Sequence, residues 1–92
     1  MLDTEKLETG LTKLRGLDFE ACEAAERAAG NTFPELSFQK SFQARLAAKA
    51  LGVNPHDIKE LPLKEYNAVT QRVFNFLYTS SGDGTASAKS GE

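Results

Sequence analysis

The chain has 92 residues, a formal net charge of -2 and a pI near 5.4, and 40% of its residues are hydrophobic. This length predicts one domain, and the acidic balance argues against a nucleic-acid-binding protein, which usually carries a basic face. No apolar run approaches the ~20 residues of a membrane span, the N-terminus lacks signal-peptide regions, and one cysteine cannot form an internal disulfide. We therefore expect a reduced, cytoplasmic, non-secreted protein that binds neither nucleic acid nor membranes.

Residues 1–17 fit two structures equally well. Leu7, Leu11 and Leu14 have helical spacing, which favours a helix. Gly10 and Gly16 interrupt that pattern and weaken a helix. A helix and a short extended segment therefore remain equal alternatives here.

The next segment predicts a helix over residues 19–29. Asp18 is a short acceptor at the expected N-cap, and Leu17 and Cys22 occupy the hydrophobic-staple positions around it. Gly30 is the C′ glycine that ends many helices. The expected inward face is made of small side chains, namely Ala21, Cys22, Ala25, Ala28 and Ala29.

After a loop at residues 31–34, the sequence predicts a helix over residues 35–51. Apolar residues cover more than half of its circumference, as in a helix that lies centrally in a fold. Gly52 ends this helix. Asn54, Pro55 and Asp57 then resemble a capping box with proline at the first helical position, and the short turn that follows carries Ile58 and Leu61 inward.

The clearest periodic signal lies in residues 63–78, directly after Pro62. Its apolar stripe contains Leu63, Tyr66, Val69, Val73, Phe76 and Leu77. We expect the other helices to pack against this one. Residues 79–92 contain no large apolar side chain, which predicts a disordered tail.

These elements together predict a mainly α protein with one helical domain over residues 1–78. The domain is a small bundle of three main helices and a short capped turn, with the extended N-terminal segment as an open alternative. The disordered tail over residues 79–92 follows it.

Residues that carry chemistry are few. His56 is the only histidine and Cys22 the only cysteine, whereas a zinc site needs about four such ligands. Cys22 among alanines behaves as a small hydrophobic residue, and His56 has no obvious partner and is expected on the solvated surface. We expect no enzyme activity, no catalytic residue, no metal and no cofactor.

Large aromatic side chains are numerous for so small a domain. All of them could belong to the core, or some could line a patch that binds a partner helix. The candidates for partner binding are Phe38 and Phe42, on a helix that is apolar nearly all round, and Phe74 and Tyr78, at the edge of the last stripe.

Residues 14–78 resemble the tail assembly chaperones of long-tailed bacteriophages. That family shows a first helix with an acidic start and a glycine end, a helix that ends in Leu-Gly, and a capped turn with Leu-Pro. An acidic or aromatic position then precedes a final helix that ends in Phe-Leu. The matching residues here are Asp18, Gly30, Leu51–Gly52, Ile58, Leu61–Pro62, Glu65–Tyr66 and Phe76–Leu77. The family often begins with a β-hairpin, from which this chain departs because its N-terminal strand character is weak.

The resemblance implies a specific function. Tail assembly chaperones bind the long, helical, aggregation-prone tape-measure protein while tail-tube subunits polymerise around it, and many are also made in a longer, frameshifted form. We therefore expect a non-enzymatic chaperone that binds apolar helical stretches of the tape-measure protein in the host cytoplasm. A tail-tube subunit is a second candidate partner, and a homo-oligomer is left open. The alternative is a small adaptor or inhibitor that masks one host protein.

Overall fold

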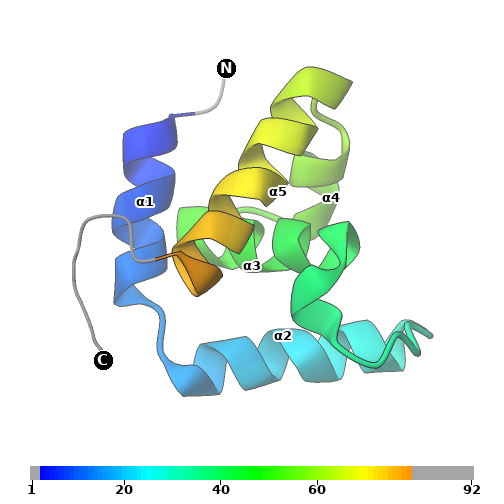
Figure 1. Cartoon of the computed structure of the whole chain (residues 1–92). Helices are drawn as coiled ribbons and strands as arrows, with labels where there is room; N and C mark the ends of the chain where they lie inside the picture. Colours follow the sequence, from blue (N-terminus) through cyan, green and yellow to red (C-terminus); the bar gives the residue numbers. More distant parts are fainter. Residues whose placement is uncertain (1–2, 80–92) are drawn as a thin grey trace.

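The structure, a computed structural model, describes residues 3–79, and its regular elements there are all helical (Figure 1). In chain order they are α1 (Thr4–Lys13), α2 (Gly16–Ala28), the 3₁₀ helix η1 (Leu36–Phe38), α3 (Lys40–Leu51), α4 (Pro55–Lys59) and α5 (Leu63–Tyr78). The predicted mainly α class is confirmed. The expected tail lies outside the described residues, apart from Thr79.

The N-terminal segment that fitted two structures is a helix. The Asp3 carboxylate caps α1 by accepting a hydrogen bond of 3.1 Å from the backbone N–H of Lys6. Leu7 and Leu11 are buried on its inner side. The bundle therefore has four long helices among the described residues rather than three, and the short α4 is the predicted capped turn.

Gly10 stands in α1 because the helix passes very close to α3. A Cβ at this position would overlap the carbonyl oxygen of Ala50. The residue that weakens the helical pattern in the sequence is thus the one that allows α1 and α3 to touch.

The central element is α3, not α5. It packs against α1, α2, η1, α4 and α5, whereas α5 packs mainly against α3 and α1. Phe42, Ala44, Leu46, Ala47 and Ala48 of α3 are all buried. The expectation that the other helices pack against α5 was wrong, because a helix with one apolar stripe is partnered on one side only.

The two ends of α2 differ from each other in how well the sequence predicted them. The helix begins at Gly16, and Asp18 is its third residue, where the carboxylate accepts a 2.9 Å hydrogen bond from the backbone N–H of Arg15. Asp18 is therefore not the N-cap, and Leu17 is 69% exposed and forms no staple. The C-terminus is as predicted, because Gly30 has a φ of +100° and its N–H bonds to the carbonyl of Arg27.

The inward face of α2 also differs from the predicted alanine face. Cys22 and Glu26 are buried, whereas Ala21, Ala28 and Ala29 are exposed. Phe19, Cys22 and Glu26 follow a helical i, i+3, i+7 spacing, which places all three toward α3. A buried carboxylate was not expected on this face. The carboxylate of Glu26 can be buried here because it is paired with other side chains.

The segment from residue 35 to residue 51 is two elements instead of one. Gln39 has extended backbone angles (φ -96°, ψ 131°) and separates η1 from α3. The predicted end at Gly52 is confirmed, as is the capping of α4, where the N–H of Asn54 donates to the Asp57 carboxylate at 3.2 Å. Ile58 is buried and Leu61 half-buried, as expected.

The predicted bounds of α5 are confirmed, but only the middle of its apolar stripe is buried. Val69 and Val73 are in the core, while Leu63 at the first turn is 74% exposed and Phe76 near the last turn is 38% exposed. Within the part of the chain that the structure describes, no helix combines the length and the apolar character needed to cross a membrane.

Candidate protein-binding site

Three of the four predicted partner-binding side chains lie together and form what we call the aromatic cluster: Phe38, Phe74 and Tyr78. Their ring centroids are 6.0 Å apart for Phe38 and Phe74, 5.5 Å for Phe38 and Tyr78, and 5.2 Å for Phe74 and Tyr78. Phe38 is 54% and Tyr78 49% exposed, and Phe74 is half-buried. The cluster is thus an apolar patch that water contacts.

Phe42 lies elsewhere. It is fully buried, and its ring meets that of Phe19 edge-on with centroids 5.0 Å apart. The prediction that Phe42 belongs to an exposed binding surface does not agree with this position. Because α3 is surrounded by the other helices, an inward ring on it has no route to solvent.

The 3₁₀ turn of η1 explains why Phe38 points outward. With about three residues per turn, residues two apart lie on different sides of such a helix. Leu36 is 1% exposed and anchors the inner side, and Phe38 consequently faces out. The buried Gln43 side chain donates a 2.8 Å hydrogen bond to the Ser37 carbonyl and holds η1 on α3.

Tyr78 is tied to η1 by its hydroxyl group. The Ser37 hydroxyl lies 2.8 Å from the Glu35 carboxylate, which in its ionised form can only accept, so Ser37 donates to it. The Tyr78 hydroxyl then donates to the Ser37 oxygen. Ser37 is fully buried, so the last residue of α5 is fixed to the rest of the domain.

A second apolar surface lies on the other flank of α5. Phe76 and Leu77 help to line a groove of about 260 Å³, together with Leu11, Leu14 and Phe19. Periodicity placed Phe76 in the buried stripe, whereas the structure leaves it 38% exposed at this groove. Between these two apolar surfaces, the outward face of α5 is polar and carries Gln71, Arg72 and Asn75.

Cys22 and His56, the single cysteine and the single histidine of the sequence, lie in different environments. Burial raises the pKa of the Cys22 thiol, although Lys49 and Arg45 act in the opposite direction. His56 is exposed and does have a partner, the Glu60 carboxylate at 3.0 Å one helical turn later. Among residues 3–79, no group of three or more His, Cys, Asp or Glu is placed to hold a metal ion.

Glu26 is the buried charged residue that the sequence did not reveal. Its carboxylate accepts hydrogen bonds from Asn31 at 2.9 Å, from the Arg45 Nε at 2.8 Å and from Ser41 at 3.3 Å. Burial acts to raise the pKa of Glu26, but these hydrogen bonds and the Arg45 charge outweigh it and lower that pKa. These three hydrogen bonds hold the carboxylate and join α2 to α3 and to the loop at Asn31.

Comparison with known proteins gives no relative for this arrangement. The chain matches no protein-family model, no curated protein and no solved structure.

Proposed function

We propose that this chain is a non-enzymatic binding protein that buries an apolar helical stretch of another protein against the aromatic cluster. The observation that carries the proposal is the exposure of Phe38 and Tyr78 in contact with each other and with Phe74. Exposed apolar patches mark interaction sites, and aromatic side chains supply much of the binding energy at such sites.

The way in which the rings are held supports the same function. Phe74 and Tyr78 are i, i+4 neighbours on a helix, and Phe38 stands on a turn anchored by buried residues. A surface that is already ordered loses little conformational entropy when a partner binds. The cluster therefore suits a partner helix that inserts apolar side chains at i, i+3 and i+4 spacing.

We further propose that the partner is the tape-measure protein of a long-tailed bacteriophage and that the chain is a tail assembly chaperone. This part of the proposal rests on the sequence pattern from Asp18 to Phe76–Leu77. A long helical client offers many apolar stretches, so each is expected to bind weakly and in similar fashion.

Co-expression with the tape-measure protein encoded with this chain tests the proposal. The native chain should keep more of the client soluble and co-purify with it, and Phe38→Ala combined with Phe74→Ala should abolish both effects. Leu63→Ala is the matched control, because Leu63 is also an exposed apolar residue of α5 but lies at the opposite end of the helix.

Two results would count against the proposal. Equal solubility of the client with and without the chain would remove the chaperone function. Tight binding of one folded protein with fixed stoichiometry would instead support the adaptor or inhibitor alternative.

A further inference from the structure

The aromatic cluster lies between two side chains of opposite charge, Lys40 and Glu35. The Lys40 ammonium lies 3.4 Å from the hydroxyl of Thr70, which is one helical turn before the first ring of the cluster on α5. Glu35 lies at the other end, because its carboxylate binds the Ser37 hydroxyl, which also contacts the hydroxyl of Tyr78. The two attachment points on α5, Thr70 and Tyr78, are about 12 Å apart along the helix.

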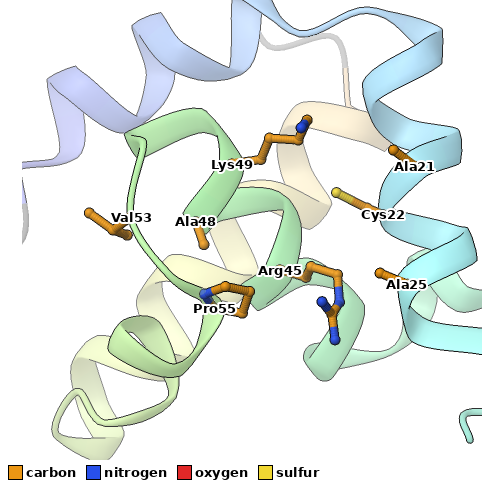
Figure 2. Close-up of a pocket in the computed structure, with 8 residues that line it drawn as sticks. All are labelled: Ala21, Cys22, Ala25, Arg45, Ala48, Lys49, Val53 and Pro55. Atoms are coloured by element: carbon orange, nitrogen blue, oxygen red, sulfur yellow. The ribbon is translucent and has the colours of Figure 1, made fainter. Parts of the chain in front are cut away.

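Neither of these two charges has a charged partner in the part of the domain that the structure describes. Lys40 and Glu35 are exposed, and within residues 3–79 neither forms a salt bridge. The other cations of α3 differ in this respect. Arg45 and Lys49 face α2 (Figure 2), and carboxylates of that helix lie 2.8 and 3.9 Å from them. Charge at the aromatic cluster is thus balanced overall but separated into two unpaired ends.

This separation of charge makes the surface complementary to itself. A two-fold axis through the cluster, perpendicular to α5, places Lys40 of each copy opposite Glu35 of the other. Gln71 and Asn75, which border the cluster on α5, are uncharged and hydrogen-bond to each other at 3.0 Å, so they add no repulsion. A partner of one charge sign would meet a like charge at one end, whereas a second copy meets opposite charges at both ends.

We propose that a second copy of this chain covers the aromatic cluster when no client is bound. Phe38, Phe74 and Tyr78 pack against the same rings across the two-fold axis. Two Lys40–Glu35 pairs fix the register of the copies. Because three partly exposed rings make a small interface, the dimer is weak and a client displaces it. The displacement by a client rests on the function proposed above, whereas the dimer itself does not.

Sedimentation velocity of the full chain at increasing concentration tests the dimer. The native chain should change from monomer to dimer, and Phe38→Ala should stay monomeric. Lys40→Glu and Glu35→Lys should each weaken dimerisation about tenfold, because each change makes two attractive pairs repulsive. Lys13→Glu, at an exposed position of α1, is the control for net charge and should dimerise like the native chain.

Exchange of the two charges provides the sharpest test of the register. The double variant Lys40→Glu/Glu35→Lys should dimerise like the native chain, because both pairs form again with their signs exchanged. An equimolar mixture of the two single variants should also dimerise, which shows that each of them is folded. A native chain that stays monomeric, or a dimer that the single reversals do not weaken, would overturn the proposal.

A synthetic amphipathic helical peptide of about 20 residues, with leucines on one face, tests the competition. Its addition should lower the dimer fraction of the native chain, and a dimer that persists with the peptide bound would contradict the shared surface. The two proposals can fail separately. A monomeric chain that still keeps the client soluble refutes only the dimer, and a dimer through the cluster that binds no client refutes only the proposed function.

Discussion

Phe38 and Phe42 are one helical turn apart in the sequence, but they have opposite environments. Phe42 is fully buried against Phe19, and Phe38 is 54% exposed in the aromatic cluster. A continuous helix from residue 35 would have placed both on one face. The extended backbone at Gln39 breaks that helix and turns Phe38 outward. The exposure of an aromatic ring here is thus set by a helix boundary rather than by periodicity.

The largest loss of stability is expected from a substitution in the buried pair of Phe19 and Phe42. Phe42→Ala should lower the free energy of unfolding by about 3–5 kcal/mol, because it leaves a cavity beside Phe19 in the centre of the core. Urea denaturation of the variant and the native chain measures this difference. A loss below about 1 kcal/mol would mean that Phe42 is not a core residue, and the contrast with Phe38 would disappear.

A substitution at Glu26 tests the polar contacts that hold α2 on α3. Glu26→Ala should cost about 2–3 kcal/mol, because it removes charge-assisted hydrogen bonds and leaves Arg45 without its buried partner. The folded-state pKa of Glu26 lies below its ordinary value of 4.5. Its contribution is therefore complete above about pH 5 and is lost as the pH falls through 4.5 toward the folded-state pKa.

The pH dependence of the stability that Glu26 contributes can be measured directly. Unfolding free energies of the native chain and Glu26→Gln, taken at intervals from neutral to acidic pH, should converge as the pH falls. A constant difference between the two proteins across this range would contradict the lowered pKa of Glu26.

A substitution at Gly10 tests whether α1 packs closely against the central helix α3. Gly10→Ala should cost about 1–2 kcal/mol, because the new Cβ overlaps the Ala50 backbone and this overpacking exceeds the gain in helix propensity. Gly16→Ala is the matched control, since no atom lies within 4 Å of a Cβ there. Thermal unfolding of both variants should show a lower midpoint for Gly10→Ala alone, and equal midpoints would mean that α1 and α3 are not in close contact.

The smallest effect on stability is expected in the aromatic cluster. Phe38→Ala should change the free energy of unfolding by less than about 1 kcal/mol, because the ring is already half in water. Binding of the client should nevertheless be lost. A large loss of stability in this variant would show that Phe38 supports the fold, and the cluster would then not be a free surface.

Much of the helical architecture could be predicted from local signals. The periodicity of residues 63–78, the glycines at positions 30 and 52, and the Asn54–Asp57 capping box each identify an element or its end, and the structure agrees with them. These signals depend on backbone geometry within a few residues. Asp3 before α1 is a further local signal, one that explains the N-terminal helix.

The sequence misled in two ways, through local helix boundaries and through contacts between distant segments. Asp18 looks like an N-cap, but it acts as the third residue of a helix that begins earlier. Glu26 is buried because Asn31, Ser41 and Arg45 converge on it, and no local pattern reveals this. Three of four candidate binding residues do meet in space, whereas Phe42 was misplaced because the break at Gln39 was not visible in the sequence.

The proposed function requires that the aromatic cluster is the surface that meets a client and that the buried pair, Phe19 and Phe42, stays untouched. NMR of the chain with labelled Phe and Tyr rings, titrated with an apolar helical segment of the client, tests this most directly. We predict that the signals of Phe38, Phe74 and Tyr78 shift together and saturate, and that those of Phe19 and Phe42 stay in place. Saturable shifts that leave Phe38 and Tyr78 unchanged would contradict it.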